Sequence, residues 1–294
     1  MLTKTRFAQC LTLSSFAALG SLALVVGCGG SSDGATGSGL LPPAFVAANG
    51  VNGGKAFDKF WAIETGWSQA DPNLAKYNAK TSFYRCKACH AGDLLGRNGV
   101  YINRDANASR PHIADVTLRT VVDTSSAQEL FDDIKRSAGR RDPNFDLTTY
   151  NATTNFTEGD KMPDYSKILT DAQIWEIVKF LKAEAIDTRK LYDSVTTGAY
   201  PTGTIAYSNI GKGGNAAAGD TIYKNQCSWC HGTDGKLIPL GTYGVGGFVR
   251  NRPDEAQHKI KFGQLGSGMG SIITDPTKML DLYKAMTNAT KYPN

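Results

Sequence analysis

The sequence predicts a mainly α protein with two tandem helical domains behind an N-terminal export segment. A length of 294 residues is enough for about two domains. The motif C-x-x-C-H occurs twice, at 86–90 and 227–231, and the two copies lie well over a hundred residues apart. A capped amphipathic segment follows each copy, at 169–181 and 275–286. Each motif therefore has its own predicted helices, which is typical of an internal repeat.

The composition excludes several classes of protein. Hydrophobic residues make up 41% of the chain and charged residues 20%, which excludes a disordered, collagen-like or coiled-coil chain. Six cysteines are too few for a disulfide scaffold. The formal net charge of +5 is small and dispersed, so no nucleic-acid partner is expected.

Residues 1–27 have the pattern of a secretory signal peptide. Lys4 and Arg6 precede a long apolar run that is interrupted only by small polar residues. The run ends in V-V-G-C at Cys28, which resembles the lipobox of bacterial lipoproteins. The resemblance implies cleavage before Cys28 and attachment of a diacylglycerol thioether to it. An ordinary cleaved signal and an uncleaved membrane-spanning helix are the alternatives.

Residues 28–48 are predicted to form a flexible tether. Residues 29–39 are almost entirely Gly, Ser, Ala, Thr and Asp, which cannot build a core. We therefore expect a lipid-anchored protein of the cell envelope that contacts the membrane through its N-terminal lipid. The resemblance to lipoproteins adds that Gly29, in place of a retention aspartate, favours the outer membrane, facing the periplasm or the cell surface.

The two C-x-x-C-H motifs predict covalent attachment of two haems c. The thiols of this motif add to the haem vinyl groups, and the adjacent histidine reaches the iron. A disulfide or half of a zinc site is the alternative, but a zinc site would need further Cys or His ligands, and every cysteine after Cys28 lies in one of the motifs. A thioredoxin-like pair is disfavoured by the histidine behind each motif. The predicted attachment residues are Cys86, Cys89 and His90 in the first motif and Cys227, Cys230 and His231 in the second.

The segments before the motifs resemble class I cytochromes c. Gly219 and Tyr223 lie four residues apart in a predicted helix, so they share a face that another helix can approach closely. Gly53 and Phe57 repeat this pair before the first motif. The resemblance implies two tandem class I cytochrome c domains, each a small helical fold around a covalently bound haem.

This resemblance also divides the chain. It implies a first domain at 49–195, with loop insertions at 66–83 and 140–160, and a second domain at 215–294. Residues 196–214 are rich in Gly, Thr, Ser and Ala without helical periodicity, and they are predicted to be a linker.

A methionine followed by a capped helix is the strongest signal outside the cysteines. Thr170 and Gln173 form a capping box at the start of an apolar stripe. By resemblance, the preceding Met162 is the distal iron ligand of the first haem, and Trp175 packs against the glycine–aromatic face before the first motif. His112 is the competing ligand, although a lone loop histidine is more often solvated or hydrogen-bonded.

The second domain matches the family less completely. A helix is predicted at 254–262 and another at 275–286, whose methionines belong to its apolar face. Met269 lies in the loop between them, where the family places its ligand, and is the expected distal ligand of the second haem. His258 is the alternative.

Haem iron held by histidine and methionine is coordinatively saturated, and thioether ligation favours the reduced state. The sequence therefore predicts an electron carrier and not an enzyme, with redox donor and acceptor proteins as partners. Arg136, Arg140 and Arg141 are a candidate docking patch or simply a solvated surface. A dihaem redox enzyme, such as a peroxidase-like oxidoreductase, is the main alternative, because such enzymes also have two tandem motifs. A subunit of a larger electron-transfer assembly is the third.

Overall fold

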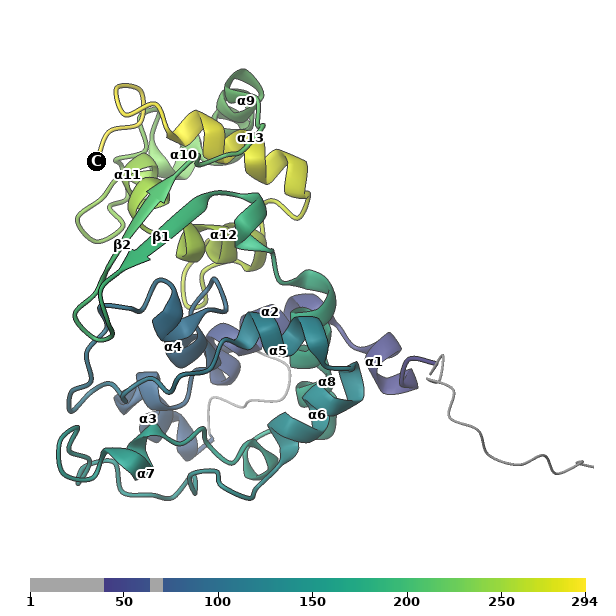
Figure 1. Cartoon of the computed structure of the whole chain (residues 1–294). Coiled ribbons are helices and arrows are strands. Elements are labelled where there is room, and N and C mark those ends of the chain that lie inside the picture. Colours follow the sequence, from purple (N-terminus) through teal and green to yellow (C-terminus); the bar gives the residue numbers. More distant parts are fainter. Residues whose placement is uncertain (1–39, 64–70) are drawn as a thin grey trace, which may run out of the picture. The chain divides into compact units, whose positions relative to one another are not determined.

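The computed structural model describes residues 40–63 and 71–294 of the chain. The predicted signal peptide, Cys28 and residues 28–39 of the predicted tether lie outside these ranges. Within the ranges described, no helix is long and apolar enough to cross a membrane. Residues 41–294 form one compact unit of short helices, turns and a β-hairpin, which confirms the prediction of a mainly α fold (Figure 1).

In the N-terminal half, residues 41–190, short α-helices are joined by single helical turns and by long loops (Figure 1). The α-helices are α1 (Pro43–Ala47), α2 (Gly50–Lys59), α3 (Asn73–Ala79), α4 (Cys86–His90), α5 (Leu118–Thr124), α6 (Ala127–Lys135), α7 (Phe156–Asp160) and α8 (Asp171–Lys179). The single turns are η1 (Phe60–Ala62), η2 (Thr81–Phe83), η3 (Gly96–Asn98), η4 (Tyr165–Lys167), the π-helical η5 (Phe180–Glu184) and η6 (Thr188–Lys190).

The end of the predicted tether is folded. Residues 43–47 form α1, and the buried Phe45 ring packs edge to face on Trp175 with 6.4 Å between ring centroids. The prediction that the tether extends to residue 48 was therefore wrong at this end, because an aromatic side chain gives the segment something to bury.

The two predicted loop insertions also contribute to the core. Tyr77 on α3 and Phe83 at the end of η2 are buried, and so are Leu147 and Tyr150 in the second insertion. These segments are therefore not surface loops throughout. The aromatic residues among their polar neighbours are what bring them into the core.

Helix α8 begins where the sequence predicts. The Thr170 hydroxyl accepts a hydrogen bond from the Gln173 N–H, and the Gln173 side chain accepts one from the Thr170 N–H, so the capping box is complete. The predicted apolar stripe is buried throughout: Ile174, Ile177, Val178 and Leu181.

Helices α2 and α8 cross at Gly53. A Cβ atom added to Gly53 would lie 1.8 Å from the carbonyl oxygen of Glu176, so only glycine allows this approach. Four residues on, the rings of Phe57 and Phe180 are 5.1 Å apart. The predicted contact of Trp175 with this face was wrong. Successive side chains of a helix are rotated by about 100° around its axis. Trp175, next to Glu176, therefore points away from Gly53, and its ring stacks on the Phe131 ring of α6 with 4.3 Å between ring centroids.

The predicted linker at 196–214 contains most of a β-hairpin and is therefore not an irregular linker. Strands β1 (Asp193–Thr197) and β2 (Thr204–Ser208) pair antiparallel, with Asp193 opposite Ser208 (Figure 1). Alternating β-branched and aromatic residues favour strands over coil. Leu191 and Tyr192 already belong to the core of the C-terminal half, so that half begins near residue 191 and not at 215.

The C-terminal half, residues 191–294, repeats the helix crossing of the first. A Cβ atom on Gly219 would lie 1.9 Å from the Asp281 carbonyl oxygen, and Tyr223 is buried beside it, which confirms the predicted close approach. Asp275 caps the last helix, whose methionines Met279 and Met286 are buried in the core as expected. The helices are α9 (Ala216–Gln226), α10 (Ser228–His231), α11 (Val245–Asn251), α12 (Pro253–Phe262) and α13 (Pro276–Met286).

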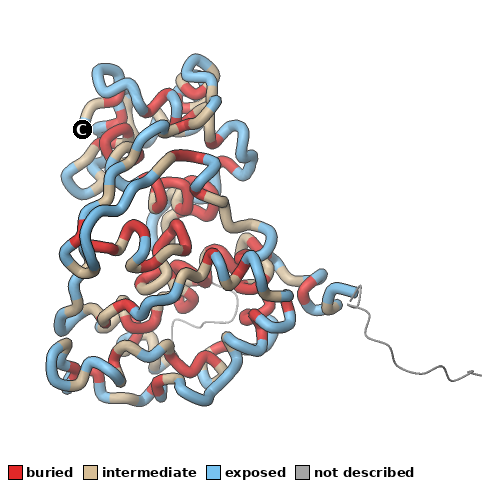
Figure 2. Tube along the Cα trace, in the orientation of Figure 1, coloured by how far each residue is buried: buried red, intermediate tan, exposed pale blue. Residues whose placement is uncertain are grey.

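Helix α12 joins the two halves. Phe262 at its end belongs to the hydrophobic core of the N-terminal half, 5.3 Å from the Phe180 ring and directly over Gly54. The Lys87 ammonium is buried between two carboxylates, with its Nζ 3.5 Å from Asp58 Oδ1 and 3.9 Å from Glu255 Oε1. Figure 2 shows buried residues running through the chain on both sides of this junction. The halves therefore share an interior instead of meeting through a loose linker.

Candidate functional site

A cavity of about 670 Å³ opens beside α4, within the range of about 300 to 1,000 Å³ usual for ligand sites. Its walls come from α4, the loop before α5, α6, α8 and residues 139–141 and 156–165. The structure brings the residues predicted for the first haem together in it: Cys86, Cys89, His90 and Met162 all line the cavity.

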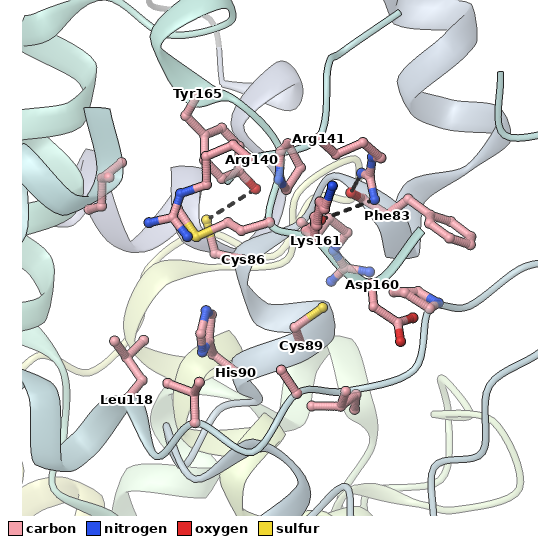
Figure 3. Close-up of a pocket in the computed structure, with 18 of the residues that line it drawn as sticks. Phe83, Cys86, Cys89, His90, Leu118, Arg140, Arg141, Asp160, Lys161 and Tyr165 are labelled. Atoms are coloured by element: carbon pink, nitrogen blue, oxygen red, sulfur yellow. Dashed lines mark hydrogen bonds between the residues drawn. The ribbon is translucent and has the colours of Figure 1, made fainter. Parts of the chain in front are cut away.

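The single turn of α4 presents the first motif to the cavity. Cys86, Cys89 and His90 stand at positions i, i+3 and i+4, which lie on one face of a helix. Figure 3 shows the two thiols and the imidazole extending into the cavity, with Arg140 and Tyr165 on one side. Ala91 ends the turn with φ 62° and ψ 180°, a conformation that favours glycine. In the second motif the equivalent residue is Gly232, with φ 79° and ψ 167°.

The electrostatics suit a neutral imidazole and protonated thiols. Burial and the nearby Arg140 charge lower the pKa of His90 to about 4, so the imidazole is neutral, as an iron ligand must be. Burial raises the pKa of Cys86 to about 11, and its sulfur lies 3.8 Å from the Tyr165 hydroxyl oxygen. A thiol with a raised pKa is the opposite of the activated thiolate of a thioredoxin-like pair.

Met162 is held in place by its main chain. The Arg141 N–H donates to the Met162 carbonyl at 2.9 Å, and the Asp164 N–H donates to the Arg141 carbonyl at 2.8 Å. Tyr165 follows in the same loop and donates from its hydroxyl to the Tyr84 carbonyl at 2.7 Å. These bonds fasten the methionine loop to residues 84 and 141.

The buried side chain of Arg141 bears on whether haem fits the cavity. Its side chain is 1% exposed and donates to the carbonyls of Gly159, Lys161 and Phe83. Among the described residues it has no ion pair with a carboxylate, and its Nε has no hydrogen-bond partner. A buried guanidinium without a counter-ion is costly. Haem supplies carboxylate groups, so a cavity that combines this cation with two thiols, an imidazole and a thioether fits haem c.

The prediction that Arg141 belongs to a docking patch was wrong, because its side chain is buried. Arg140 and Arg136 also line the cavity. Sequence reasoning missed the structural roles of Arg141 and Tyr165. The tyrosine directly after Met-Pro-Asp was the available signal for the second, but nothing in the sequence around Arg141 distinguishes a buried arginine from a surface one.

His112 lines the same cavity but is engaged elsewhere. Its Nδ1 lies 3.3 Å from Asp160 Oδ2, and its main-chain N–H donates to Asp160 at 2.8 Å. The ring packs edge to face on Tyr200 at 5.0 Å. The Asp160 contact occupies Nδ1 and leaves Nε2 free, so His112 stays the alternative ligand to Met162.

The second motif is more exposed. Cys227 is partly buried behind α9, Cys230 is exposed and the Nδ1 of His231 is buried without a hydrogen-bond partner. Burial lowers the pKa of His231, which keeps this imidazole neutral as well. Met269 and Cys227 both pack against the core of the C-terminal half.

Apolar side chains flank this second motif without cover. Trp229, between the two cysteines, is 84% exposed, and Leu237 and Ile238 are also exposed. Large apolar groups gathered in this way favour an apolar ligand over them. His258, the alternative ligand, is buried instead against Phe57 and Phe180 of the N-terminal half, with ring centroids 6.4 and 5.9 Å away.

The family comparison decides the nature of the first site. The Cytochrome c family model matches residues 77–184, a stretch that includes α4, Met162 and α8. Residues 77–184 form a cytochrome c domain. Covalently bound haem c, with its iron, is the cofactor of such a domain, and haem-based electron transfer is its typical activity. No curated protein and no solved structure matches the chain.

Proposed function

We propose that this protein is a dihaem c-type cytochrome that relays single electrons between donor and acceptor proteins of the bacterial cell envelope. The observation that supports this most strongly is the cavity in which Cys86, Cys89, His90 and Met162 meet within the matched cytochrome c domain. An electron carrier, and not a catalyst, is the function these residues favour.

Each residue of the first site has a defined task. Bound haem would supply a one-electron change of its iron, and His90 and Met162 would be the two residues that hold this iron. Cys86 and Cys89 fix the cofactor covalently, and neutral His90 provides the proximal nitrogen. Met162, fastened through Arg141, provides the distal sulfur. Arg141 would balance a carboxylate group of the bound haem, which would offset the cost of burying its guanidinium.

Three features support a second haem in the C-terminal half. The motif Cys227-x-x-Cys230-His231 follows α9 directly. The α9–α13 crossing repeats the α2–α8 crossing, with a glycine against a backbone carbonyl in both. Trp229 and its exposed apolar neighbours provide a surface that a porphyrin would cover. Met269 is the proposed distal ligand of this haem.

The envelope location rests on the sequence before residue 40. We propose that residues 1–27 are removed as a lipoprotein signal, that Cys28 carries the lipid and that the outer membrane is the destination. Haem attachment to C-x-x-C-H motifs requires free thiols to meet haem outside the cytoplasm, so an export signal is consistent with both motifs.

The test is the near-infrared absorption of the ferric protein, which reports methionine bound to iron. We expect both haems to contribute to this band. Met162→Ala should remove the contribution of the first haem, and Met269→Ala should remove that of the second. Met279→Leu is the matched control, because Met279 is buried in the core and should leave the band unchanged. High-spin ferric haem with rapid peroxide turnover in the unmodified protein would instead support the dihaem enzyme.

A further inference from the structure

A second cavity, of about 290 Å³, lies where the two halves meet. Arg104 and Arg110 reach it from the long loop after η3, and Arg252 reaches it from the start of α12. Both halves therefore contribute positive charge to one recess. The remaining polar lining consists of Asn103, Asn251 and Tyr101.

These arginines are poorly compensated. Arg104 donates to the Ser82 hydroxyl at 3.2 Å and lies over the Tyr101 ring at 4.3 Å, which are both uncharged partners. The nearest ion-pair partner of Arg252 is Glu255 at 3.8 Å, which is longer than a hydrogen bond. Arg110 has no side-chain ion pair among the described residues. Three arginines around one recess repel one another, and an anion between them would relieve this repulsion.

The lining also defines the class of anion. Among the residues that the structure describes, no carboxylate lines the recess, while the arginine and asparagine side chains offer many N–H donors. Burial raises the pKa of Tyr101, so its hydroxyl remains a donor. The volume lies at the lower limit for ligand sites, which suits a small ion with water and excludes a nucleotide-sized ligand. Arginine forks bind tetrahedral oxyanions through paired hydrogen bonds.

We propose that this recess binds one small oxyanion of the sulfate or phosphate class, which bridges the N-terminal and C-terminal halves. The anion contacts arginines of both halves and so stabilises their junction. If the proposed function holds, the anion also helps to fix the placement of one haem site relative to the other.

Titration calorimetry of the full-length haem-loaded protein tests this site. The protein is held in chloride at constant ionic strength and titrated with sodium sulfate and, separately, with inorganic phosphate. We expect one saturable site per chain for at least one of the two ions. Arg110→Gln and Arg252→Gln should each weaken binding about tenfold, because each removes a charge-assisted hydrogen bond.

Arg189→Gln is the matched control. Arg189 is an exposed arginine paired with Asp187, so its loss changes the net charge equally but should leave affinity unchanged. Bound anion should also raise the unfolding temperature of the unmodified protein and not that of the Arg110→Gln, Arg252→Gln double variant. Absence of saturable binding, or equal weakening by Arg189→Gln, would overturn the proposal. Haem content measured on the same samples tests the proposed function separately.

Discussion

Replacing Gly53 by alanine tests the helix crossing that supports the first haem cavity. The added Cβ would lie 1.8 Å from the Glu176 carbonyl oxygen, whereas a C···O contact needs about 3.3 Å. Helices α2 and α8 would have to separate by roughly 1.5 Å, and overpacking of this kind costs about 1–3 kcal/mol. Because the added Cβ meets backbone, which cannot move aside, we take the upper end of this cost, about 3 kcal/mol. The better helix propensity of alanine offsets about 1 kcal/mol of it.

The expected net loss is about 2 kcal/mol in the free energy of unfolding, or roughly 4–8 °C in unfolding temperature for a unit of this size. Circular dichroism during heating measures it. Gly50→Ala is the control on the same helix, because its added Cβ meets the flexible side chains of Glu184 and Lys179, which can move. The control should change the unfolding temperature little. Gly53→Ala as stable as the unmodified protein would refute the close crossing.

Two further perturbations address buried charge. Arg141→Gln removes donors from three buried carbonyls, and we expect it to lower the free energy of unfolding by about 3 kcal/mol in denaturant titrations; a loss below about 1 kcal/mol would contradict this role. Burial and the nearby Asp254 charge raise the pKa of Asp93 to about 7. The folded protein therefore retains a proton that the unfolded chain releases near pH 4, so stability from this group declines as the pH rises from about 4 to 7. Asp93→Asn should flatten that decline, and an unchanged pH profile would argue against the raised pKa. Finally, His112→Asn should leave the near-infrared methionine band of the ferric protein unchanged, because Met162 is the proposed ligand; a methionine band that is missing from the first haem of the unmodified protein and appears in His112→Asn would favour His112 as the ligand.

Local sequence patterns predicted the helix caps and the close helix crossings well. The capping box at Thr170, the cap at Asp275 and the glycine–aromatic pairs depend on neighbours within four residues, and such relations are visible in the sequence. The grouping of Cys86, Cys89, His90 and Met162 in one cavity likewise follows from a motif and a loop with recognisable flanks.

What could not be predicted depends on contacts between distant segments. Trp175 and Glu176 are neighbours in α8, and the sequence alone does not determine which of the two faces α2. Arg141 is buried because carbonyls from η2 and from the end of α7 converge on it. The sharing of α12 between the halves, through Phe262 and His258, has no local signature at all.

The mass of the intact protein under denaturing conditions tests the central claim most directly, because covalently attached haem remains on an unfolded chain. We expect the mass of the polypeptide plus two haems, with one haem lost when Cys86 and Cys89 are replaced by alanine and the other lost when Cys227 and Cys230 are replaced. A single haem that depends only on Cys86 and Cys89 would contradict the dihaem relay and leave one cytochrome c centre.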